Sequence, residues 1–126
     1  MDKVFISLRN AFFGLRYCFC TQRNMVIHTL VGILVIVTAL LLRVTLTGIL
    51  FLLTAVFSVL VAEAFNTAIE KTIDLYTSEH KKLARVAKDV AAGAVLLASL
   101  FAFVVGIIVL GLPLWQFLSS LLDRVG

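Results

Sequence analysis

The sequence contains few charged residues, few cysteines and no strand-like alternation of polar and apolar residues. Only 14% of its 126 residues are charged and 62% are hydrophobic, whereas about a quarter of the residues of an average soluble domain carry charge. So few charges cannot cover the apolar surface of a soluble fold of this length. Cys18 and Cys20 offer two ligands where a structural zinc site needs four, so we assign them no chemistry. The mean hydropathy of +1.12 indicates a protein that lies in lipid.

Three long uncharged runs occupy residues 24–42, 44–62 and 90–122. A membrane-spanning helix needs roughly 20 apolar residues, and a spanning backbone must satisfy its own hydrogen bonds, which favours helices. The second run continues in helix-forming residues to about Tyr76. We therefore predict an all-α membrane protein with a single domain. It comprises residues 1–126, with a surface helix at 1–23 and membrane helices at 25–42, 44–76 and 84–111.

Basic residues gather in the first 23 residues and between the second and third runs, while Arg43 stands alone between the first two. The positive-inside rule then puts the N-terminus in the cytoplasm. Arg9, Arg16 and Arg23 recur every seven residues beside an apolar face, which is typical of an amphipathic interfacial helix. These arginines could reach lipid phosphate or nucleotide, or could simply anchor the helix to anionic headgroups.

A polar stripe follows the second apolar run. Its members are spaced at 0, 3, 7 and 11, within about 80° of one another on a helix, and are Glu63, Asn66, Glu70 and Asp74. An ionisable residue inside a membrane span is a functional hypothesis by default. Glu63 lies deepest and, with no cation expected beside it, would suit proton removal from an alcohol. Carboxylates here could hold Mg²⁺ with substrate phosphates, and Lys88 and Arg85 could balance the phosphates. The alternative is a polar helix interface that serves assembly only.

The segments "EAFNTAIEKTIDL" and "AKDVAAGAVLLA" resemble the signature of the prokaryotic diacylglycerol kinase family, which includes the undecaprenol kinases. The size, the segment "GLRYCFCTQRNMVIH" and the three predicted spans agree with that family. The resemblance implies a homotrimer with active sites shared between subunits, using ATP and Mg²⁺. Consistently, the chain has no P-loop and no G-x-G-x-x-G. A row of alanines from Ala84 to Ala102, at alternating three- and four-residue spacing, independently predicts close packing of the third span against other helices.

Carried over by position, the resemblance makes Glu63 the general base toward the lipid hydroxyl and Asn66 a group that positions the reacting centre. It makes Glu70 a ligand of the metal and the nucleotide. The further nucleotide-binding residues it implies are Lys88, Asp89, Glu79, His80 and Lys81. Arg16 is assigned to the lipid substrate.

Gln22 departs from the family, which commonly has a glutamate there as a second metal ligand, so metal affinity rather than the fold is in question. His28 occupies a position where an acidic residue or histidine is usual, and we interpret it as a polar group at the membrane edge.

The sequence therefore predicts a lipid kinase whose partners are a membrane lipid alcohol, ATP and further copies of itself, with no nucleic acid. The lipid is undecaprenol or diacylglycerol, and "RNMVIH", "NTAIE" and "AAGAVL" are closer to the undecaprenol kinases. The rival hypothesis is a non-catalytic small membrane subunit or transporter, in which the polar stripe carries ions or binds a partner.

Overall fold

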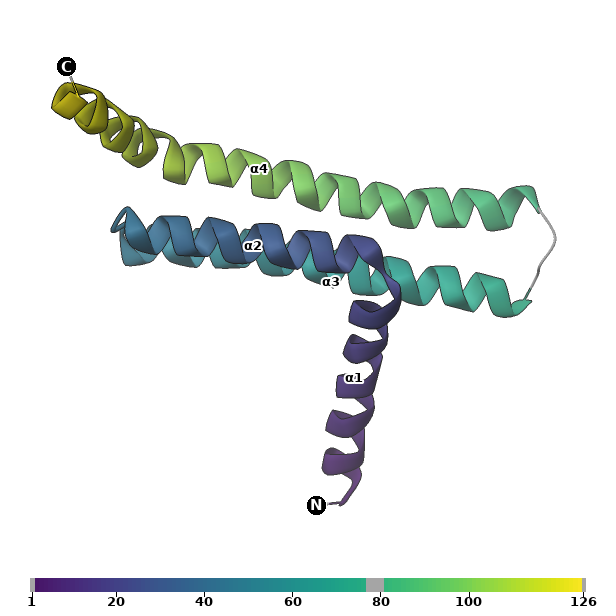
Figure 1. Cartoon of the computed structure of the whole chain (residues 1–126). Coiled ribbons are helices and arrows are strands. Elements are labelled where there is room, and N and C mark those ends of the chain that lie inside the picture. The colour runs from purple at the N-terminus through teal and green to yellow at the C-terminus, as the bar shows by residue number, and fades with distance from the viewer. Residues whose placement is uncertain (1, 77–80, 126) are drawn as a thin grey trace.

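The computed structural model describes residues 2–76 and 81–125, and these form four helices with no strand. They are α1 (Asp2–Thr21), α2 (Arg23–Leu41), α3 (Leu46–Tyr76) and α4 (Lys82–Val125). Helices α2, α3 and α4 run side by side in alternating directions, and α1 leaves the bundle sideways where α2 begins (Figure 1). The prediction of an all-helical chain is confirmed.

Three of these helices are long and apolar enough to cross a membrane, as predicted. At 1.5 Å per residue, the 19 residues of α2 extend about 28 Å, close to the ~30 Å thickness of the hydrocarbon layer. The 31 residues of α3 extend about 46 Å, so one end of α3 must project beyond that layer. Large apolar side chains face outward along all three helices, as a lipid-exposed surface requires, for example Leu34, Phe57 and Ile108.

Helix α4 continues past the predicted end at residue 111 and contains Pro113. A proline inside a helix removes one backbone hydrogen bond and kinks the helix without necessarily ending it. The C-terminal part of α4 bends away from the rest of the helix accordingly (Figure 1). The predicted span ended at residue 111, whereas apolar residues such as Phe117 and Leu121 continue the helix beyond the proline.

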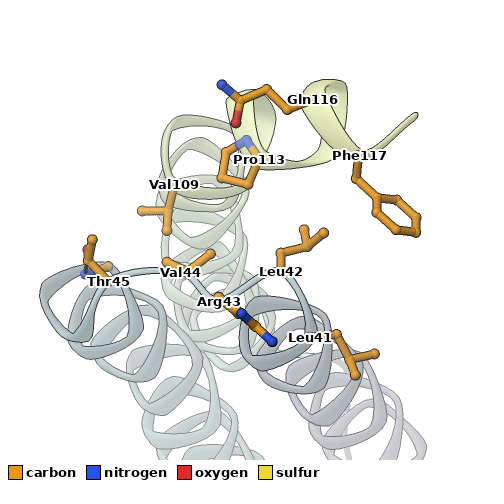
Figure 2. A pocket seen from close by; sticks show the side chains of 10 residues that line it. Leu41, Leu42, Arg43, Val44, Thr45, Val109, Pro113, Gln116 and Phe117 are labelled. Carbon is orange, nitrogen blue, oxygen red and sulfur yellow. Dashed lines mark hydrogen bonds between the residues drawn. The ribbon is translucent and has the colours of Figure 1, made fainter. Parts of the chain in front are cut away.

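The turn between α2 and α3 is short, as "RVTLTG" predicts. Arg43 adopts a left-handed conformation with φ of 53°. Its N–H donates to Leu40 O at 3.1 Å, and the Val44 N–H donates to Ala39 O at 3.0 Å, which is the Schellman arrangement that closes a helix. The turn faces the bent part of α4 across an open cavity of about 630 Å³ that Arg43, Pro113 and Gln116 help to line (Figure 2).

Small residues let α2 and α3 approach closely. A Cβ on Gly32 would lie 2.6 Å from Val56 Cγ1, so glycine is required for this contact. Nearer the turn, Ala39 and Leu52 are fully buried together with Leu110 of α4. The hairpin register is thereby fixed by packing, and it determines which polar residues meet at the other end of the bundle.

Candidate active site

The polar stripe of α3 lies along the half of the helix that is remote from the α2–α3 turn. Glu63 is buried, Asn66 and Glu70 are half-buried, and Asp74 is exposed in the last turn. The Asn66 Nδ2 donates a hydrogen bond to Glu70 Oε1 at 3.1 Å. This contact holds both side chains on one face, at the spacing that the sequence predicts.

His28 of α2 lies against Glu63. Its Nε2 is 3.2 Å from Glu63 Oε1, and the side chains are 28% and 3% exposed, respectively. The ring is within ion-pair distance of that oxygen, but the contact does not meet the geometry of a hydrogen bond. The sequence predicts no cation beside Glu63, and the structure brings an imidazole of α2 next to it.

The hairpin register explains this pairing and could have predicted it. In an antiparallel hairpin, residues at similar distances from the turn lie opposite each other, and Ala39 and Leu52 do so near the turn. His28 lies eleven residues before Ala39, and Glu63 lies eleven residues after Leu52, so these two residues should also lie opposite each other. The sequence contained the signal, but using it required the turn to be placed to within one residue.

Two buried oxygen atoms of this stripe accept no hydrogen bond from the described residues, namely Glu63 Oε1 and Asn66 Oδ1. They belong to residues almost one helical turn apart. A buried acceptor without a donor costs ~1–3 kcal/mol, so such atoms call for an explanation. A bound hydroxyl group or a hard cation would satisfy both.

Helix α4 contributes cations at the end of the stripe. Lys88 Nζ donates to Asp74 Oδ1 at 2.6 Å, and Lys71 Nζ lies 3.6 Å from Asp74 Oδ2. Asp74 is solvent-exposed, and the hydrogen bond from Lys88, with the charges of both lysines, holds the pKa of its carboxyl below the ordinary value. Asp89 pairs with Arg85 at 3.8 Å on the exposed side of α4. The chain thus brings Lys88 to the stripe but directs Asp89 toward Arg85.

Other predicted site residues are not joined to the stripe. Gln22 precedes α2, and its Nε2 donates to Thr21 Oγ1 at 3.4 Å. Within the described residues, no hydrogen bond or ion pair links Gln22 to Glu70, and no group of three His, Cys, Asp or Glu residues could hold a metal ion. Arg16 is exposed on α1. Lys81 provides the backbone carbonyl that receives the Arg85 N–H at 3.1 Å, while Glu79 and His80 lie outside the described residues.

A groove lies between α1 and the same half of α3. Its volume is about 800 Å³, and small side chains such as Ala11, Gly14 and Ala68 leave it open. Its lining is mostly apolar, with Lys71 and Asp74 at one end. Sequence reasoning missed this groove, although the small residues on both helices were a possible signal. Its shape and lining suit a hydrocarbon chain whose polar end lies toward the lysine.

Comparison with known proteins bears on this arrangement. The sequence profile of the family described as "Prokaryotic diacylglycerol kinase" matches residues 9–110. The chain belongs to this family. The part of this chain that matches the prokaryotic diacylglycerol kinase family includes the whole polar stripe, together with Gln22, His28 and Lys88.

Two relatives carry different names. A diacylglycerol kinase of Synechocystis is 43% identical over 102 residues, which are 80% of this chain and 58% of that protein. An undecaprenol kinase of Bacillus subtilis is 29% identical over 109 residues, which are 86% of this chain and 89% of that protein. The chain thus spans little more than half of the first relative and most of the second.

Proposed function

We propose that this protein transfers the γ-phosphoryl group of ATP to the hydroxyl group of a membrane lipid. The observation that carries the proposal is the buried carboxylate of Glu63, which has an acceptor oxygen without a hydrogen bond from the described residues, as has Asn66 almost one helical turn further along α3. Membership of a family whose relatives include two named lipid kinases supports it.

In this mechanism Glu63 removes the proton from the lipid hydroxyl as its oxygen attacks the γ-phosphorus. The bond between that phosphorus and the bridging oxygen breaks, and ADP leaves. Asn66, which is hydrogen-bonded to Glu70 at 3.1 Å, positions the reacting groups. Enzymes of this type gain most of their rate from positioning and charge neutralisation.

The residues present fit magnesium in part. Glu70 has a carboxylate and Asn66 a carbonyl oxygen that lacks a donor among the described residues, and both are hard oxygen ligands of the kind Mg²⁺ prefers. One or two protein ligands suffice when substrate phosphates complete the shell. When bound, the ion would neutralise charge on the phosphates. Gln22 is the proposed additional ligand, contributed to a shared site by a neighbouring subunit.

Lys88 is the proposed phosphate contact, because its ammonium lies at the end of the stripe. An ammonium has three donors, so Lys88 can hold Asp74 and a phosphate oxygen together. The assignment of Asp89, Glu79, His80 and Lys81 to the nucleotide remains a proposal from the family resemblance.

The lipid enters, in this proposal, through the groove between α1 and α3, with α1 lying in the cytoplasmic membrane interface and Arg16 at the level of the headgroups. The two relatives are named for different lipids, so both diacylglycerol and undecaprenol are candidates. The higher identity is to the diacylglycerol kinase.

A homotrimer with sites between subunits completes the proposal. Exposed small residues on α4, such as Ala87 and Ala94, leave a face against which another helix can approach closely. The basic residues of the N-terminal segment support an orientation in which the N-terminus and the active site are on the cytoplasmic side of the inner membrane.

The decisive test replaces the proposed base. Glu63→Gln keeps the size of the side chain but cannot take a proton, so lipid phosphorylation should fall by about 10²-fold or more while assembly and Mg-ATP binding persist. Asp123→Asn, which removes an exposed carboxylate near the far end of α4, is the matched control and should keep full activity. Turnover near normal in Glu63→Gln would refute the base assignment.

The same assay separates the kinase from a transporter or non-catalytic subunit. ATP consumption by the purified protein in lipid vesicles should require an added lipid alcohol, and each alcohol is tested separately. ATP consumption that ignores the alcohol, or no phosphorylated lipid with either alcohol, would contradict the proposed function.

A further inference from the structure

The proposed reaction releases one proton at every turnover, because a neutral hydroxyl group becomes a phosphate ester. That proton arrives on Glu63, whose side chain is only 3% exposed. A carboxyl group that remains protonated cannot act as a base again. The proton must therefore leave Glu63 before the next cycle, and bulk water has almost no access to this carboxyl.

One titratable side chain of the described residues is in direct contact with the carboxyl of Glu63. On α3 itself, Glu70 is seven residues and about 10 Å further along the axis, while Asn66 and Thr67 do not titrate. The lysine of α4 that lies nearest the stripe, Lys88, is bonded to Asp74. His28 of α2 is the titratable group whose side chain contacts Glu63, with 3.2 Å between Nε2 and Oε1.

His28 also has the exposure that such a route needs. Its side chain is 28% exposed, roughly ten times the fraction for Glu63, and it lies five residues after the start of α2, near the end of the span, while Nε2 contacts the buried carboxyl. Imidazole is the side chain that changes charge most readily near neutral pH. The ring therefore connects a buried proton acceptor with the outside.

We propose that His28 is the proton exit of the active site, an inference that rests on the proposed kinase function. The proton moves from Glu63 Oε1 to His28 Nε2 and gives an imidazolium beside a carboxylate. The imidazolium then releases one proton to water at its exposed edge, and exchange with water restores the neutral ring with a free Nε2. Glu63 is again ionised, and one proton has left for each lipid phosphorylated.

This role differs from simply holding Glu63 in place. A purely positional contact could be made equally well by an amide, which cannot carry a proton. It would also affect the first turnover as strongly as later ones. In contrast, an enzyme without its proton exit still completes one turnover, because Glu63 begins the cycle ionised.

The experiment therefore compares first and later turnovers in His28→Gln. With saturating Mg-ATP and lipid alcohol in vesicles, rapid quenching should show a burst of about one phosphorylated lipid per site, followed by steady turnover at least about tenfold slower than in the unaltered protein. The KM for ATP should be unchanged. Thr38→Val, elsewhere on α2, is the control and should show no burst and normal turnover.

Chemical rescue gives a second measurement. Added imidazole should raise the steady-state rate of His28→Ala by several-fold without affecting Glu63→Gln. Normal turnover in His28→Gln would overturn the inference, as would a first turnover slowed as much as later ones with no rescue by imidazole. If the unaltered protein is active and Glu63→Gln is not, such a result refutes the role of His28 as proton exit and leaves the proposed kinase function unaffected. Absence of lipid phosphorylation by the unaltered protein would instead refute the proposed function.

Discussion

The close contact between Gly32 and Val56 makes a prediction that links packing to catalysis. In Gly32→Ala the new Cβ would lie 2.6 Å from Val56 Cγ1 and 3.3 Å from Cγ2. Carbon atoms attract at about 3.5 Å or more, so the nearest contact must lengthen by about 0.9 Å. Valine has one strongly preferred rotamer in a helix, and the helices should therefore move apart.

The energy has two opposing parts. Overpacking of this kind costs ~1–3 kcal/mol, while alanine in place of glycine favours a helix by ~1 kcal/mol. Gly32→Ala should therefore destabilise the protein by up to about 2 kcal/mol. Val56→Ala removes both offending methyl groups and leaves Cβ, which lies at an ordinary 3.6 Å. The double variant should be more stable than the sum of the single variants by about 1–3 kcal/mol.

The separation of α2 and α3 in Gly32→Ala should also affect the candidate active site. Gly32 is one helical turn from His28, and Val56 is two turns from Glu63. A separation of about 0.9 Å would take the 3.2 Å contact between His28 and Glu63 to about 4 Å, the limit of an ion pair. Turnover of Gly32→Ala should therefore fall and should recover in the double variant.

Equilibrium unfolding in mixed detergent micelles and steady-state lipid phosphorylation measure both quantities. Gly106→Ala is the control, because a Cβ at Gly106 meets nothing within 4 Å, and that variant should keep its stability and activity. Strict additivity of the Gly32 and Val56 changes, or destabilisation without loss of turnover, would refute the reasoning.

Further predictions concern the metal and the nucleotide. Because a carboxylate is a better ligand for Mg²⁺ than an amide, Gln22→Glu should lower the free Mg²⁺ concentration that gives half-maximal activity, and Glu70→Gln should raise it sharply. An unchanged requirement in Gln22→Glu would place residue 22 outside the metal shell. Asp74→Asn should lower the KM for ATP by about two- to fivefold, since the Lys88 ammonium is then no longer partly neutralised by an exposed carboxylate while it holds the phosphate. Lys88→Met should raise the KM for ATP, as measured by steady-state kinetics. An unchanged KM in both variants would show that Lys88 does not contact the nucleotide.

Much of the fold could be predicted from the sequence because hydropathy and helical spacing are local properties. The three membrane-spanning helices follow from uncharged runs of sufficient length, and the shared face of Asn66 and Glu70 follows from their spacing. The continuation of α4 through Pro113 could not be predicted, because a proline kinks some helices and ends others, depending on the residues that pack around it.

The missed parts of the site depend on contacts between helices. The pairing of His28 with Glu63 requires the register of the α2–α3 hairpin, and the engagement of Lys88 by Asp74 requires that of α3 and α4. The groove requires the direction in which α1 leaves the bundle. In the proposed trimer a neighbouring subunit brings Gln22 toward Glu70, so this contact depends on the arrangement of subunits rather than on spacing within one chain.

The length of α2 has a consequence for the lipid environment. His28 lies thirteen residues before Leu41, so about 20 Å of helix separates it from the far end of α2, which is less than the ~30 Å of a typical hydrocarbon layer. The short turn at Arg43 joins α2 to α3, so the two helices must tilt together when the bilayer is thinner than their apolar length. Thin bilayers would bring the His28–Glu63 pair toward the headgroup region, where a lipid hydroxyl lies, and thick bilayers would bury it more deeply. The acyl-chain length of the surrounding lipids would thereby set how far a lipid hydroxyl must descend to reach the proposed base.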